Sequence, residues 1–88
     1  MTERAVPIVN RLGLHARPAA EFVKVAARFA CDVKVRKDSM EVNGKSIMGM
    51  MMLAAEQGSE LIITVNGDDG KQALDALEAL IRAGFGED

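Results

Sequence analysis

The stretch Gly13–Phe22, GLHARPAAEF, joins a predicted strand to a predicted helix and contains His15, the one histidine among 88 residues. Gly13 permits a tight or left-handed backbone, and Pro18 suits the first turn of a helix, where a missing N–H costs nothing. His15 therefore falls at the residue that caps the helix or just before it. The stretch predicts a sharp change of chain direction followed at once by a helix.

Four segments have the composition of β-strands. Three contain β-branched clusters or short apolar runs, and a weaker fourth follows the second strand after a plausible hairpin connection. These segments are residues 5–9, 31–35, 61–65 and 39–43. Pro7 offers a sheet no N–H, which predicts an edge position or a bulge for the first strand.

Two amphipathic helices follow from the spacing of apolar residues. Apolar side chains recur at intervals of three and four between Ala19 and Ala30 and between Ala73 and Ile81, as in helices with one buried face. Residues 68–70 supply turn and capping chemistry for the second of these helices, and Gly84 is a natural stop.

A short middle helix is predicted from Ser46 toward Ala55, with Gly58 ending it. The resulting order is strand, helix, strand, strand, helix, strand, helix, with no internal repeat or linker, so a single domain is expected over residues 1–88. Helices that cover one face of a mostly antiparallel sheet give an α+β fold, an open-faced two-layer sandwich.

Composition and charge exclude several classes of protein. Eleven Lys and Arg against thirteen Asp and Glu give a net charge of -2, which offers no overall attraction to nucleic acid or anionic lipid. No segment approaches the ~18 apolar residues of a membrane span, so a cytoplasmic protein without membrane insertion is expected. Cys31 and His15 together cannot supply a zinc site. We expect no metal and no cofactor, and Cys31 as a small buried residue at a strand start.

The helix start at His15 favours phosphate chemistry. The free N–H groups of Ala16 and Arg17 and the positive end of the helix dipole form an anion pocket, and the Arg17 side chain adds a planar cation suited to phosphate. A free imidazole, whose pKa is about 6.5, is a nucleophile near neutral pH without a dedicated base. The stretch therefore suits a transient phosphohistidine. Spacing alone also fits His15 as a plain loop residue beside a capped helix.

Two motifs resemble the HPr family, the histidine-containing phosphocarriers of the bacterial phosphotransferase system. They are NRLGLHARPAAEF at residues 10–22 and NGKSIMGMMMLAAEQGSEL at residues 43–61, at the family's usual separation, and the resemblance covers essentially the whole chain. It implies four antiparallel strands under three helices. It also implies that His15 accepts a phosphoryl group from enzyme I through Nδ1, that Arg17 stabilises this group, and that enzyme IIA domains receive it. A monomer with no independent turnover is expected.

Ser46 lies in NGKSIM, which resembles the segment that HPr kinase/phosphorylase modifies in HPr proteins regulated on serine. The plainer role is the N-cap of the short helix, and both roles can hold because a phosphate is tolerated at a helix start. Phosphorylation would act on partners by adding about -1.5 to -2 charge to the docking surface.

The resemblance further implies a surface for protein partners, made of Ala20, Lys24, Arg28, Lys45, Ile47, Met48, Met51 and Met52. Flexible methionines suit a surface that meets several partners in turn. About half of the set Ile47, Met48, Met51 and Met52 is instead expected in the core. A solvated face accounts equally well for each lysine or arginine taken singly.

The sequence departs from the sugar-transport members of the family at Ala16, Ala27 and Gly49, where some of them have polar or basic residues. This predicts weaker electrostatic docking to enzyme I, or its redistribution to Arg28. The start NRLGLHARPA and the ending LIRAGFGED look more like NPr, the branch linked to nitrogen and potassium regulation.

Two other classes of function are open. A purely regulatory HPr-like binding module would act through docking and Ser46, but it would have no use for a nucleophile at His15. A small hydrolase or a nucleic-acid binder fits worst, because no nucleophile with an orienting acid and no basic stripe with aromatic platforms is visible.

Overall fold

One antiparallel sheet, with strand order β1-β4-β2-β3, organises the chain in the computed structural model, which describes residues 2–87. The strands are β1 (Thr2–Pro7), β2 (Asp32–Lys37), β3 (Met40–Asn43) and β4 (Glu60–Asn66). Every neighbouring pair of strands runs antiparallel. β1 lies at one edge and ends at Pro7, which confirms the edge position that the proline predicted.

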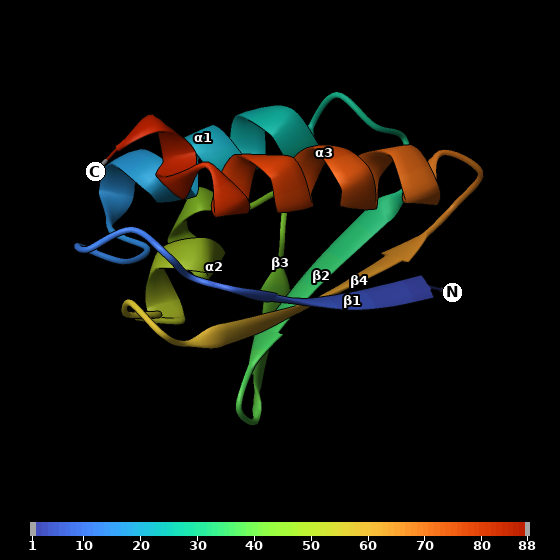
Figure 1. Ribbon diagram of the computed structural model, residues 1–88. Coiled ribbons are helices and arrows are strands. Elements are labelled where there is room, and N and C mark those ends of the chain that lie inside the picture. Colours follow the sequence, from blue (N-terminus) through green and yellow to red (C-terminus); the bar gives the residue numbers. More distant parts are fainter. Residues whose placement is uncertain (1, 88) are drawn as a thin grey trace.

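Three helices lie on one side of the sheet and leave its other face uncovered (Figure 1). They are α1 (Ala16–Ala26), α2 (Ile47–Met52) and α3 (Gly70–Arg82), and a 3-10 turn at Gly84–Gly86 follows them. α1 and α3 lie side by side, whereas the short α2 packs against α1 and β3. The predicted open-faced α+β sandwich with the order βαββαβα is therefore confirmed. Within residues 2–87, no helix combines the length and the apolar character needed to cross a membrane.

The core forms between the sheet and the helices because alternate strand residues point to the helical side. Val33 pairs with Val65 and Val35 with Ile63 across β2 and β4, and all four are buried. The helices contribute fully buried residues that include Phe22, Leu74, Leu77 and Ile81. Cys31 is buried just before β2, as predicted, and this burial raises the pKa of its thiol.

Three predicted boundaries are wrong. The first strand covers residues 2–7 rather than 5–9, and α1 ends at Ala26 rather than Ala30. α2 ends at Met52 instead of continuing toward Ala55, because Ala54 adopts a left-handed backbone with φ of 49°. Gly58 lies in the turn before β4. Apolar spacing continues past the last helical turn in both helices, so it could not locate their ends.

Asp69 stands at the N-cap position of α3, but its side chain makes no capping hydrogen bond there. Its carboxylate instead accepts the backbone N–H groups of Ala30 (2.7 Å) and Cys31 (2.9 Å). These contacts lower the pKa of Asp69, and the hydrogen bond from the Ala30 N–H is the largest cause. The predicted capping role is thus replaced by a link between the start of α3 and the segment that follows α1.

The methionines of α2 are distributed differently from the prediction. Ile47, Met48, Met51 and Met52 are all exposed, whereas Met50 is fully buried. The prediction that about half of those four residues enter the core is wrong. A helix of six residues that lies on the edge of the core turns few side chains inward, and Met50 fills the inward position.

Replacing Met50 with Ala should destabilise the fold by about 2–5 kcal/mol, because it removes a fully buried side chain and leaves a cavity. Met48→Ala is the matched control, since Met48 is 76% exposed, and it should change the free energy of unfolding by less than about 0.5 kcal/mol. Urea denaturation of both variants measures the difference. Equal effects would show that α2 does not sit on the core through Met50.

Candidate functional site

His15 is the N-cap residue of α1, with an extended backbone (φ -80°, ψ -171°). The loop before it is tight at Gly13, which has φ of 70°. A Cβ at this position would lie 2.5 Å from the carbonyl oxygen of Ala55. The next N–H, that of Leu14, donates to this same oxygen at 2.8 Å. The predicted turn and helix start are therefore observed. Together they fix the backbone position from which the His15 side chain extends.

The first turn of α1 leaves two backbone donors free of intrahelical partners, the N–H groups of Ala16 and Arg17. Pro18 follows them and has no N–H, and the N–H of Ala19 donates to the carbonyl oxygen of His15 at 3.0 Å. Helix starts attract anions through such unpaired donors and the helix dipole. Both Ala16 and Arg17 are exposed, so an anion beside His15 has access to them.

Glu87 contacts His15 from the other end of the chain, a contact that sequence reasoning missed. Nε2 of His15 lies 3.1 Å from Oε1 and 3.0 Å from Oε2 of the Glu87 carboxylate. A carboxylate only accepts hydrogen bonds, so Nε2 carries the proton. In the neutral ring, Nδ1 then holds the free lone pair. The contact with His15 is the main cause that lowers the pKa of Glu87.

The turn after α3 places Glu87 beside the start of α1, where the C-terminal end of the chain lies in Figure 1. Gly84, Phe85 and Gly86 have consecutive positive φ angles of 66°, 57° and 78°. Such a backbone is unfavourable for a bulky side chain, and burial of the Phe85 ring, which is 8% exposed, holds it there. Glycines that flank a phenylalanine were the one sequence signal for this reversal.

Two shallow hollows flank the imidazole. One, of about 250 Å³, is lined by Arg11, Leu12, Arg17, Gly86 and Glu87. The other, of about 340 Å³, is lined by Leu12, Leu14, His15, Ala16, Met51 and residues 54–56. The predicted residues His15, Ala16 and Met51 therefore share one depression, and Arg17 lines its neighbour. Arg11, which sequence reasoning did not single out, adds a second guanidinium to the Arg17 side.

The residues predicted for partner binding lie on α1, on α2 and just before α2. Lys24 and Arg28 are exposed, and Ala20 is half-buried. Lys24 Nζ lies 3.5 Å from the carboxylate of Glu21. Lys45 is more constrained than predicted, because its ammonium donates to the carbonyl oxygen of Phe29 at 2.7 Å.

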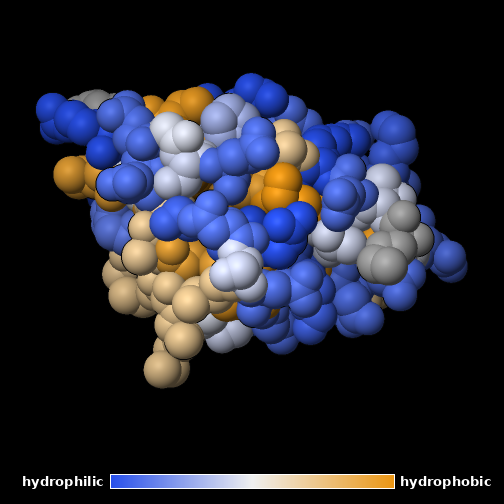
Figure 2. All heavy atoms as spheres, turned by 90° about the horizontal axis from the view of Figure 1, so that it is seen from below, coloured by the Kyte–Doolittle hydropathy of each residue, from blue (hydrophilic) through white to orange (hydrophobic). Residues whose placement is uncertain are grey.

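The exposed side chains of α2 join an apolar surface. Its members are Ile47, Met48, Met51 and Met52, with Leu12 exposed on the loop before His15. Seen from the uncovered side of the sheet, weakly hydrophobic surface gathers at one end of the molecule, next to a largely hydrophilic region (Figure 2). Large exposed apolar surface on a small chain is typical of an interaction site.

Ser46 is the N-cap of α2, as predicted, and its Oγ accepts the N–H of Gly49 at 3.0 Å. The side chain is half-buried. Its place between β3 and α2 puts any modification at the edge of the exposed methionines.

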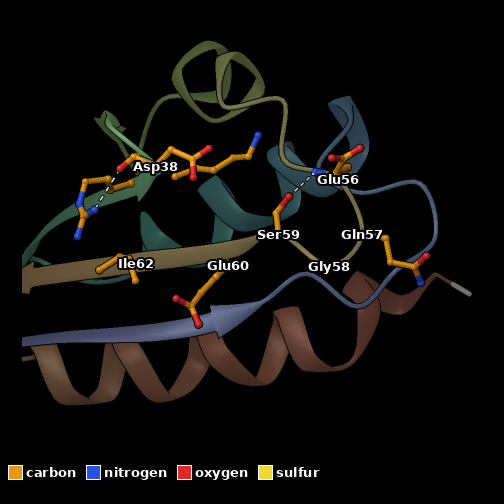
Figure 3. Close-up of a pocket in the computed structure, with 9 residues that line it drawn as sticks. Asp38, Glu56, Gln57, Gly58, Ser59, Glu60 and Ile62 are labelled. Carbon is orange, nitrogen blue, oxygen red and sulfur yellow. Dashed lines mark hydrogen bonds between the residues drawn. The ribbon is translucent and has the colours of Figure 1, made fainter.

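A larger hollow of about 620 Å³ contains none of the predicted site residues. It lies between the β2–β3 turn and the segment before β4 (Figure 3), where Ser59 Oγ accepts the N–H of Glu56 at 3.0 Å. Its walls carry Arg36 and Lys37 together with the carboxylates of Asp38, Glu56 and Glu60. Because its walls carry both signs of charge, this hollow favours neither an anionic nor a cationic ligand. The start of α1, which does favour anions, is therefore the candidate site.

Comparison with known proteins shows the family of the chain. Residues 2–83 match the family model described as "PTS HPr component phosphorylation site". The phosphocarrier protein HPr of Cupriavidus necator is 46% identical over 99% of this chain and 98% of its own. The solved structure of HPr from Thermoanaerobacter tengcongensis has a TM-score of 0.95 at 46% identity and covers 100% of this chain and 99% of its own.

A further solved relative is Crh of Bacillus subtilis, described as a catabolite-repression protein that forms a domain-swapped dimer. It is 43% identical, with a TM-score of 0.76, over 96% of this chain and 97% of its own. The family match and the shared open-faced sandwich define the class of small HPr-like phosphocarrier proteins. The chain belongs to the HPr family of the phosphotransferase system.

The lowered pKa of Glu87 predicts how the contact with His15 responds to acid. A carboxylate with a depressed pKa stabilises the folded state above its ordinary value of 4.5, and this contribution is lost as the pH falls through the lower folded value. Titration of the Glu87 carboxyl ¹³C shift should therefore give a midpoint below 4.5. His15→Ala should move this midpoint upward, and an unchanged midpoint in that variant would contradict the contact.

Proposed function

We propose that the protein carries a phosphoryl group on Nδ1 of His15, which accepts it from enzyme I and passes it to enzyme IIA domains. The observation that carries this proposal is the contact between Nε2 of His15 and the Glu87 carboxylate. Because a carboxylate only accepts hydrogen bonds, this contact favours the tautomer with the proton on Nε2 and supports Nδ1 as the nucleophile.

The transfer needs no acid or base. The Nδ1 lone pair attacks phosphorus, the bond between phosphorus and the donor atom of phospho-enzyme I breaks, and its electron pair stays with the donor. The Nε2 proton remains in place, so the ring gains positive charge, which the Glu87 carboxylate stabilises. During delivery to enzyme IIA the P–N bond breaks, its electron pair returns to Nδ1, and the ring is neutral again.

Arg17 and the start of α1 hold the transferred group. The N–H groups of Ala16 and Arg17 donate to phosphoryl oxygens, and the Arg17 guanidinium supplies a planar cation. Exposure of Arg17 keeps this stabilisation modest, because water screens it. A carrier needs this balance, since a group held too tightly would not be passed on.

Partners dock, in this proposal, on the exposed faces of α1 and α2 around His15. Met51 lines the same hollow as His15, so a protein that reaches the imidazole also covers α2. Ile47, Met48 and Met52 with Ala20 supply apolar contact, and Lys24, Arg28 and Lys45 face the acidic side of partners. We expect the protein to act in the cytoplasm as a monomer. The segments NRLGLHARPA and LIRAGFGED favour the nitrogen-regulatory branch of the family.

Incubation with phosphoenolpyruvate and enzyme I from either the sugar or the nitrogen branch tests the carrier function. Mass spectrometry should show an acid-labile gain of one phosphate, faster with the nitrogen enzyme. His15→Ala should abolish the gain. Arg17→Ala should slow it by roughly tenfold, and Arg17→Lys should restore part of the rate. No gain with either enzyme would favour a regulatory binding module instead.

Ser46 is proposed as a regulatory site for HPr kinase/phosphorylase. Ser46→Asp should slow the transfer from enzyme I to His15, because it places a negative charge beside the docking surface. Aspartate is also a good N-cap, so this variant keeps the helix intact. Ser46→Ala is the control for the loss of the hydroxyl and should destabilise the fold by about 0.5–2 kcal/mol without this electrostatic block. A transfer rate in Ser46→Asp equal to that of the wild type would contradict the inhibitory role.

A further inference from the structure

Asn10 is a buried polar residue beside the site, with only 1% of its surface exposed. It lies in the loop between β1 and His15, a position for which the sequence indicated no role. Its Nδ2 donates to the carbonyl oxygen of Gly13 at 2.8 Å and to Oε1 of Glu87 at 3.1 Å. Both partners are acceptors, so the orientation of the amide is fixed by its contacts.

The other end of this amide has no partner. Oδ1 of Asn10 is buried and makes no hydrogen bond to any residue from 2 to 87. An unpaired buried acceptor is unfavourable, and leucine would fill a similar space without this cost. The benefit of asparagine at this position therefore comes from its NH₂ group, which is the part that reaches Glu87.

The amide of Asn10 and the imidazole of His15 share one oxygen. Oε1 of Glu87 lies 3.1 Å from Nδ2 of Asn10 and 3.1 Å from Nε2 of His15. Through Gly13, the same NH₂ group also binds the loop two residues before His15. Asn10 thus joins the two segments that meet at the imidazole, the loop before α1 and the turn after α3.

Glu87 depends on such a partner because of its place in the chain. It follows the left-handed run at residues 84–86, and within this turn its own N–H donates to the carbonyl oxygen of Gly84 at 2.9 Å. Its side chain is still 18% exposed, so burial alone does not settle its rotamer. The contact with Asn10 helps to lower the pKa of Glu87 and keeps the carboxylate charged.

We propose that Asn10 is a positioning residue for phosphoryl transfer, whose NH₂ group holds the Glu87 carboxylate against Nε2 of His15 and thereby keeps the proton of the neutral ring on Nε2 and the lone pair on Nδ1. Asn10 itself touches neither the phosphoryl group nor a partner. The proposal rests on the proposed function of His15 as the phosphoryl carrier.

Four proteins form a thermodynamic cycle that tests this role: the wild type, Asn10→Leu, Glu87→Ala and the double variant. The first measurement is the ¹⁵N shifts of the His15 ring in the unphosphorylated protein. Glu87→Ala should shift Nε2 and Nδ1 toward the values of a free imidazole, and Asn10→Leu should move them part of the way. The double variant should match Glu87→Ala alone, because Asn10 acts through Glu87.

The second measurement is the rate at which enzyme I phosphorylates His15. Asn10→Leu should lower kcat by roughly three- to tenfold and leave KM unchanged, since Asn10 is buried and outside the docking surface. In the Glu87→Ala background the same substitution should have no further effect. Asn66→Leu, at an exposed asparagine at the end of β4, is the matched control and should behave as wild type.

Wild-type ring shifts in Asn10→Leu, or additive effects in the double variant, would overturn the proposal. Asn10→Ala replaces Asn10→Leu if the latter does not fold, as judged by circular dichroism. Failure of both to fold would assign Asn10 to the fold alone and would also overturn the proposal. If wild-type His15 takes no phosphoryl group, the carrier function fails, while the ring shifts still decide whether Asn10 positions Glu87.

Discussion

In the proposed mechanism, the hydrogen bond between Nε2 of His15 and the carboxylate of Glu87 decides which ring nitrogen reacts. An imidazole has two nitrogens, and a nucleophile needs the unprotonated one. The Glu87 carboxylate accepts a hydrogen bond from Nε2, so in the neutral ring the nitrogen with the free lone pair is Nδ1. In the proposed mechanism this single contact selects Nδ1 as the nucleophile and places the stabilising negative charge of Glu87 next to the ring.

This contact joins residues 72 positions apart, and much of the fold serves to bring them together. The sheet and α3 carry the chain back over α1, and the buried ring of Phe85 anchors a left-handed turn at the end of α3. Gly13 lets the loop before His15 pass against the carbonyl oxygen of Ala55. Left-handed backbone thus occurs in both segments that meet at the imidazole, at Gly13 and at residues 84–86.

The sequence was most informative where a local rule operates. Gly13, Pro18 and Ser46 could be placed at a turn, a first helical turn and an N-cap, because each role depends on near neighbours in the chain. The burial of the α2 side chains and the role of Asp69 were misjudged, since burial and hydrogen bonds depend on how the helices pack on the sheet. Glu87 and Asn10 left no periodic or spacing signal, because their roles exist only when distant segments fold together.

The most direct test of the account is the position of the phosphoryl group on the imidazole. Ring ¹⁵N-labelled protein, phosphorylated with phosphoenolpyruvate and enzyme I, would be examined by NMR for coupling between ³¹P and each ring nitrogen. Coupling to Nδ1 of His15 is expected, with the proton still on Nε2. Phosphorus bound to Nε2, or to a residue other than His15, would show that the contact with Glu87 does not direct the chemistry.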